Sequence, residues 1–79
     1  MSSVIKTPLS GTFYRRPSPD ADPYVGEGDA VKAGDVVGLI EIMKTFHEVK
    51  SEEEGTADRF LVENEESIEV GQEILLLRD

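Results

Sequence analysis

The sequence predicts an all-β domain, a flattened barrel or sandwich of two quasi-symmetric four-stranded halves. Three observations favour this fold class. Short runs of β-branched and apolar residues alternate with Gly, Pro, Asp or acidic turns, helical periodicity is hard to find, and the chain repeats parts of itself. Because the chain has only 79 residues, we expect all of it, residues 1–79, to form one domain.

The expected strands follow one another at short intervals. Seven or eight are predicted, and the clearest runs read SSVIKT, GTFYR, VVGLIEI, FHEV, RFLVE and EILLL. The side chains expected in the core are Phe13, Val36, Ile40, Val49, Phe60, Leu61, Ile74 and Leu76.

An internal repeat relates the two halves of the chain. Gly11-Thr12 recurs 44 positions later as Gly55-Thr56, and AVKAGDVVGLI is echoed by SIEVGQEILLL, in which Gly71 follows Gly34 by 37 positions. Each half ends with a turn glycine followed by a last strand. Since neither half could bury its apolar face alone, we expect the halves to pack together with approximate two-fold symmetry.

The difference between the two offsets gives the first half seven extra residues, between Gly11 and Gly34. The best candidate is RRPSPDADPYV, residues 15–25. Its three prolines, Pro17, Pro19 and Pro23, cannot donate ladder hydrogen bonds and restrict the backbone. A protruding, semi-rigid loop is therefore expected there.

Composition excludes several classes of partner and site. With 17 acidic and 8 basic residues, the net charge of −9 argues against nucleic acid and membrane surfaces. The acidic runs at 51–55 and 63–67 are interpreted as solvated loops. Cysteine is absent, which rules out disulfides and thiolate metal sites, and no segment is typical of a signal peptide or a membrane span. We expect a cytoplasmic location.

Met43 and Lys44 lie where the two halves meet, between the strand-like runs LIEI and TFHE. A two-residue hairpin loop there places both residues at positive φ, which costs about 1 kcal/mol or more each. That register pairs Ile42 with Thr45, Glu41 with Phe46 and Ile40 with His47. Hairpins favour Asn-Gly at such a loop, and a local misfit of this kind is typical of functional sites.

A lysine on a hairpin tip can be reached from every side. An exposed lysine amine is protonated at neutral pH, so Lys44 is better suited to accept an activated acyl group from an enzyme than to act as a nucleophile by itself. His47 is the single histidine and is interpreted as a sheet residue. With no cysteine beside it, we predict no catalytic residue, no metal site and no enzymatic activity.

The stretch GTFYRRPSPDADPYVGEGDAVKAGDVVGLIEIMKTFHEV resembles the biotinyl domain of biotin carboxyl carrier proteins, especially those of acetyl-CoA carboxylase. The resemblance extends from about residue 4 to residue 77. Family members read Glu-Ala-Met-Lys-Met around the biotinylated lysine. Here Glu41, Met43 and Lys44 match, whereas Ile42 and Thr45 replace the alanine and the second methionine.

The run GTFYR-x-PSPDA is the more specific part of this resemblance. In the family it marks a proline-rich thumb near the biotin head group, and here it coincides with the seven extra residues, so residues 15–25 are called the thumb. The family usually has threonine at the position of Arg16.

The resemblance implies a carboxyl carrier. A biotin protein ligase would attach biotin to Lys44, and a biotin carboxylase and a carboxyltransferase, as in an acetyl-CoA carboxylase, would then load and unload the carboxyl group. The residues implied at the cofactor are Lys44, Met43, Glu41 and, in the thumb, Arg16, Pro17, Ser18, Pro19 and Asp20. Two alternatives are a lipoyl carrier, whose tip typically reads Asp-Lys-Ala, and an unmodified interaction module.

Overall fold

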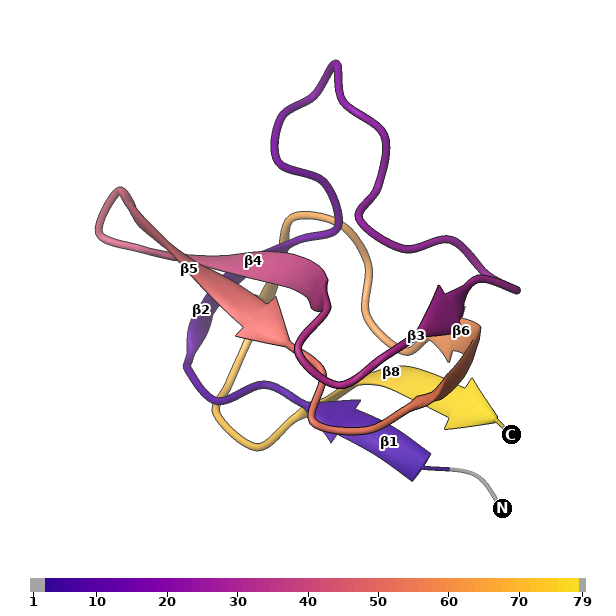
Figure 1. The fold of residues 1–79 in the computed structure, drawn as a ribbon. Coiled ribbons are helices and arrows are strands. Elements are labelled where there is room, and N and C mark those ends of the chain that lie inside the picture. Colours follow the sequence, from indigo (N-terminus) through magenta and orange to yellow (C-terminus); the bar gives the residue numbers. More distant parts are fainter. Residues whose placement is uncertain (1–2, 79) are drawn as a thin grey trace.

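Eight strands in two four-stranded antiparallel sheets make up the computed structural model, which describes residues 3–78 (Figure 1). The all-β prediction is confirmed, and the number of strands agrees with it. The strands are β1 (Ser3–Lys6), β2 (Gly11–Tyr14), β3 (Ala30–Val31), β4 (Val36–Ile42), β5 (Thr45–Lys50), β6 (Gly55–Phe60), β7 (Glu66–Ile68) and β8 (Glu73–Arg78).

The strand orders of the two sheets show the two-fold symmetry directly. One sheet runs β1-β8-β6-β3 and the other runs β5-β4-β2-β7. Exchanging each strand of the first half for its counterpart in the second half (β1 for β5, β2 for β6, β3 for β7 and β4 for β8) converts one order into the other. Each sheet takes two strands from each half of the chain, so neither half could form its sheet alone.

Matching corners follow the first strand of each half. The Thr7 hydroxyl donates to the Leu9 carbonyl oxygen at 2.7 Å and accepts from the Leu9 N–H at 3.3 Å. The Ser51 hydroxyl makes the same pair of bonds with Glu53, at 2.6 and 3.1 Å. Thr7 and Ser51 are the only buried polar residues among residues 3–78, and these local bonds satisfy their hydroxyls.

The two glycines matched by the repeat lie at these corners. Gly34 and Gly71 have φ of 95° and 87°, in the region that favours glycine. The Gly34 N–H donates to the Ser51 carbonyl oxygen at 2.7 Å, and the Gly71 N–H donates to the Thr7 carbonyl oxygen at 2.9 Å. Equivalent glycines therefore close equivalent corners, as the repeat predicts.

The same symmetry locates the seven extra residues. The Glu65 N–H donates to the Phe13 carbonyl oxygen, and the Gly28 N–H donates to the Ala57 carbonyl oxygen, at 2.6 and 2.7 Å. Fifteen positions separate Phe13 from Gly28, whereas eight separate Ala57 from Glu65. The insertion thus lies between Phe13 and Gly28, in the segment that rises at the top of Figure 1 between β2 and β3.

Apolar side chains of both sheets fill the space between them. The Phe13 ring lies at its centre, fully buried, and its centroid is 6.1 Å from that of Phe60. Gly38 leaves room for that ring, since a Cβ there would come within 2.5 Å of Phe13 Cε1. The buried core cluster comprises Ile5, Phe13, Val25, Val31, Val37, Ile40, Val49, Ala57, Val62, Ile68, Ile74, Leu75 and Leu77.

The structure corrects part of the predicted core. Strand β6 ends at Phe60, so the last three residues of RFLVE lie outside the strand, and Leu61 is exposed while Val62 is buried. Leu76 is only half-buried because it points to the face of its sheet opposite Leu75 and Leu77. Two more of the predicted core residues, Val36 and Phe60, are also half-buried.

Candidate functional site

The β4–β5 hairpin carries Lys44 at its tip and has the predicted register. Ile42 pairs with Thr45, which leaves Met43 and Lys44 as a two-residue loop. Their φ angles are 49° and 66°, so both residues occupy the left-handed region expected for such a turn. The pairs Glu41–Phe46 and Ile40–His47 are confirmed as well.

The tip is open to solvent. Met43 is 93% exposed, and Lys44 is exposed beside it. Between residues 3 and 78 the only ion pairs are Lys50–Glu48 and Arg78–Asp58, so no carboxylate of that range holds the Lys44 amine. The hairpin projects away from the side where β1 starts and β8 ends (Figure 1). An enzyme can therefore enclose the Lys44 side chain without disturbing the body of the domain.

Behind the tip, one face of the hairpin sheet carries Glu41, Tyr14 and Phe46. The Tyr14 hydroxyl donates to Glu41 Oε1 at 3.0 Å, and its ring lies 6.0 Å from that of Phe46 at an angle of 57°. The hydrogen bond to Glu41 is the main cause that raises the pKa of Tyr14. Glu41 is therefore tied to the strand that leads into the thumb.

The root of the thumb is fixed on both sides. The Arg15 N–H donates to Asn64 Oδ1 at 2.8 Å, and the Arg15 carbonyl oxygen accepts from the Tyr24 N–H at 2.9 Å. The Arg15 guanidinium lies 4.1 Å from the centroid of the Phe60 ring, a cation–π contact. Val25, at the far end of the thumb, is buried in the core. The thumb is thus anchored where it leaves the sheets and where it returns.

A pocket of about 340 Å³ lies between the thumb and the hairpin. This volume is within the range of small-molecule sites. Its lining comes from the thumb, from the strands beneath it and from the β6–β7 connection: Tyr14, Arg16, Pro17, Ser18, Pro19, Phe46, Asn64 and Glu65. Of the five thumb residues that the resemblance places at the cofactor, Arg16 to Asp20, only Asp20 does not line it. Lys44, Met43 and Glu41 also lie outside its lining.

The sequence analysis did not identify Tyr14, Phe46, Asn64 or Glu65 as site residues. One signal could have pointed to Phe46, which follows Lys44 by two positions and would be a costly exposed aromatic without a role; it is 56% exposed. Asn64 and Glu65 could not have been found, because they reach the thumb from a distant part of the chain.

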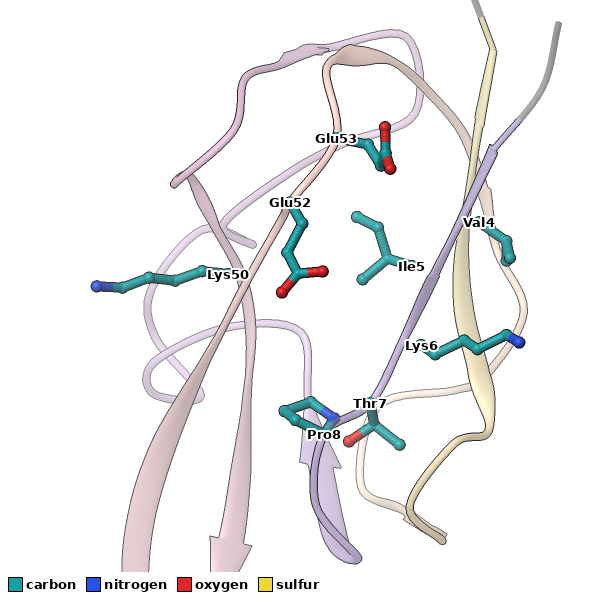
Figure 2. Close-up of a pocket in the computed structure, with 8 residues that line it drawn as sticks. All are labelled: Val4, Ile5, Lys6, Thr7, Pro8, Lys50, Glu52 and Glu53. Atoms are coloured by element: carbon teal, nitrogen blue, oxygen red, sulfur yellow. The ribbon is translucent and has the colours of Figure 1, made fainter.

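A second pocket, of about 370 Å³, lies at the opposite end of β5 from Lys44. Its lining residues come from the two symmetric corners, the segments 4–8 and 50–53. In Figure 2 the Glu52 carboxylate points toward the space between the two segments, while the amine ends of Lys6 and Lys50 point away from it. The residues that line this pocket give no indication of a ligand.

Neither a metal centre nor a membrane helix is found in the described part of the chain. No group of three His, Asp or Glu side chains within residues 3–78 could hold a metal ion. His47 is exposed on β5. Within the same range, no helix is long and apolar enough to cross a membrane.

Comparison with known proteins gives consistent matches. The family model described as "Biotin-requiring enzyme" matches residues 3–77. The biotin carboxyl carrier protein of acetyl-CoA carboxylase from Pseudomonas aeruginosa is 36% identical over 75 residues, which cover 95% of this chain and 48% of that protein. The protein of the same name from Streptococcus pyogenes is 39% identical, with coverage of 95% and 45%.

A plant relative and a solved structure extend the comparison. A chloroplastic carrier of acetyl-CoA carboxylase from Arabidopsis thaliana is 37% identical over 92% of this chain and 29% of its own length. The crystal structure of the Kluyveromyces lactis urea carboxylase matches with a TM-score of 0.78 and 26% identity, covering 99% of this chain and 6% of that one. The chain thus spans about half or less of the length of these proteins.

Proposed function

This chain belongs to the biotin/lipoyl attachment family, whose "Biotin-requiring enzyme" model matches residues 3–77, and we propose that Lys44 is its attachment residue. The family membership makes it a biotinyl carrier domain rather than a catalytic one. We further propose that the domain spans residues 1–79, with residues 15–25 as its thumb, and that the carrier serves a carboxylase resembling acetyl-CoA carboxylase.

The observation that carries this proposal is the position of Lys44. It stands exposed on a two-residue tip at positive φ, with no described carboxylate within ion-pair distance. Keeping Met and Lys in the left-handed region costs about 1–2 kcal/mol per residue. A sequence selected for stability alone would have glycine there, so the cost favours a role for these two side chains.

Lys44 supports an acyl-transfer reaction in a simple way. The ligase would present biotin as an acyl-adenylate. The deprotonated Nζ attacks its acyl carbon and a C–N bond forms. The bond from that carbon to the adenylate oxygen breaks, AMP leaves, and the nitrogen gives up a proton to water. Met43 and Glu41 flank Lys44 and are proposed as the residues that the biotin protein ligase recognises. Tyr14 keeps the Glu41 carboxylate in place through its 3.0 Å hydrogen bond.

The residues around the thumb suit the attached group. When bound, biotin supplies a ureido nitrogen that takes up a carboxyl group from one enzyme and gives it to another. Phe46 lines the pocket and follows Lys44 by two positions, so their Cα atoms are at most about 7 Å apart. The arm of an acylated lysine is longer than this separation, so the pocket, with thumb residues Arg16 to Pro19 as one wall, can receive the ring.

A domain of this kind acts by raising local concentration. A short tether gives its group an effective concentration in the millimolar range, provided that both active sites can reach it. The proposed partners are a biotin protein ligase, a biotin carboxylase and a carboxyltransferase. The proposed compartment is the cytoplasm, although the plant relatives are named chloroplastic.

The intact mass of the chain after incubation with a biotin protein ligase, biotin and ATP tests the proposal. The parent and a Lys50→Ala control are expected to gain one biotinyl group, whereas Lys44→Ala gains none. Modification of the Lys44→Ala variant would place the acceptor elsewhere. A lipoyl group gained from a lipoate ligase instead would favour the lipoyl carrier, and no modification by either enzyme would favour the interaction module.

A further inference from the structure

Arg16 is the one cation in the lining of the thumb pocket. It is half-buried, and no carboxylate of residues 3–78 lies within 4.0 Å of it. Its neighbour Arg15 already has a partner, because the Arg15 guanidinium stacks on the Phe60 ring. The Arg16 guanidinium is therefore available to a guest in the pocket.

The charge of the rest of the molecule makes this cation unusual. The chain has a net charge of −9, so most of its surface repels anions. Acylation of Lys44 removes the positive charge at the tip, because an amide nitrogen is not protonated. In the modified domain, Arg16 thus becomes the cation that a tethered group meets when it folds back toward Phe46.

Resting on the proposed function, we infer that Arg16 makes the thumb pocket an anion site, which holds the carboxylated form of the biotin ring in preference to the neutral ring. A guanidinium matches a carboxylate in shape and can donate two parallel hydrogen bonds to it. Glu65 is the one acidic residue in the same lining and opposes an anionic guest. The guest carboxylate is therefore expected on the Arg16 side.

Holding the carboxylate slows its loss. When the carboxyl group leaves, the N–C bond breaks, its electron pair stays on the ureido nitrogen, carbon dioxide departs, and water supplies a proton to that nitrogen. The negative charge thus moves off the carboxylate in the transition state. An ion pair to the carboxylate oxygens stabilises the starting state more than the transition state, so the carboxylated carrier lives longer.

The experiment compares biotinylated chains after carboxylation by a purified biotin carboxylase with MgATP and ¹³C-bicarbonate. Once the enzyme is removed, intact mass follows the loss of the carboxyl group. Arg16→Thr is expected to shorten the lifetime about two- to five-fold, the range set by partly exposed ion pairs, and Arg16→Lys by less. Glu65→Gln is expected to lengthen it. Arg59→Thr removes an equal charge from β6 and should change nothing.

A spectroscopic readout accompanies the lifetimes. The Arg16 Nε–H signal is expected to shift when the biotinylated chain is carboxylated, and salt should reverse part of that shift. Equal lifetimes for the parent and Arg16→Thr, or equal shortening by Arg59→Thr, would each overturn the inference alone. A biotinylated parent that accepts no carboxyl group would overturn the carboxyl-carrier function on which the inference rests. A parent that gains no biotin would overturn the proposed function as well.

Discussion

The Tyr14 hydroxyl donates a 3.0 Å hydrogen bond to Glu41 Oε1, joining the strand that enters the thumb to the strand that ends in the Lys44 hairpin. Thr12 is the direct partner of Glu41 across β2 and β4, so Tyr14 reaches Glu41 diagonally on the same face of the sheet. One side chain thus links the strands that carry the two proposed functional segments, and its bond joins residues 27 positions apart.

The first prediction concerns the titration of Tyr14. Because its hydrogen bond to the Glu41 carboxylate favours the neutral phenol, the pKa of Tyr14 lies above the ordinary tyrosine value of 10.0. Glu41→Gln is expected to lower that pKa toward 10.0, as followed by the ¹³Cζ signal of Tyr14. The pKa of Tyr24 is raised by burial and by Glu48, so it serves as the internal control.

The raised pKa of Tyr14 also predicts how the free energy of unfolding changes with pH. A pKa raised on folding stabilises the native state fully below the unfolded value of 10.0, and the contribution is lost as the pH rises through the folded value. In urea titrations, the parent is expected to lose more stability than Tyr14→Phe between neutral and strongly alkaline pH. An equal loss in both would show that the bond contributes nothing.

The second prediction concerns the tip. Met43→Gly removes the strain of about 1–2 kcal/mol that a residue with a side chain has in the left-handed region. It also raises the entropy of the unfolded chain, which opposes folding by about 0.5–1 kcal/mol. A net gain of about 0.5–1 kcal/mol in the free energy of unfolding is expected in urea. Met43→Ala keeps the strained backbone and should show no gain. If the ligase reads the Met43 side chain, both variants will be biotinylated more slowly than the parent.

The third prediction concerns space beneath the Phe13 ring. A Cβ on Gly38 would lie 2.5 Å from Phe13 Cε1 and 2.8 Å from its Cζ. Gly38→Ala is expected to lower the free energy of unfolding by about 1–3 kcal/mol, the usual cost of overpacking. Gly26→Ala is the matched control, because its nearest neighbour is Asp29 Oδ2 at 3.4 Å. Equal melting temperatures for the two variants would contradict the packing described here.

The fourth prediction tests the symmetry of the corners. Thr7→Val and Ser51→Ala each remove a buried hydroxyl that bonds the chain two residues further on. Each should cost about 1–3 kcal/mol, the range for leaving a buried partner unsatisfied, and the costs should be similar. Ser67→Ala, on an exposed position of β7, should change stability by less than about 0.5 kcal/mol. A large difference between the two corners would show that the symmetry is geometric but not energetic.

Much of the fold could be predicted because its signals are local. The Lys44 hairpin joins strands that are adjacent in sequence, so alternation and the shortness of the loop set its register. The repeat located Gly34 and Gly71, because a glycine at positive φ is visible in sequence as a residue that a turn requires. The seven-residue difference between the halves placed the insertion in the same way.

Local signals did not predict the end of a strand where no glycine, proline or other turn residue marks it. RFLVE has the composition of a strand, yet β6 stops at Phe60, and Leu61 instead donates its N–H to the Ile74 carbonyl oxygen at 2.8 Å. Which side chains of β8 are buried also depended on the sheet opposite, which a single run of leucines does not reveal.

The sequence by itself determined that Lys44 would stand on a hairpin tip, that two similar halves would pair, and that a proline-rich loop would interrupt the first. Only the tertiary structure decided that Arg16 would line one pocket with Phe46 and Glu65, and that Tyr14 would donate a hydrogen bond to Glu41. The reason is physical. The register of a hairpin follows from hydrogen bonds between residues that are close in the sequence. The position of the thumb instead depends on contacts such as the hydrogen bond from Arg15 to Asn64, whose partners are 49 positions apart.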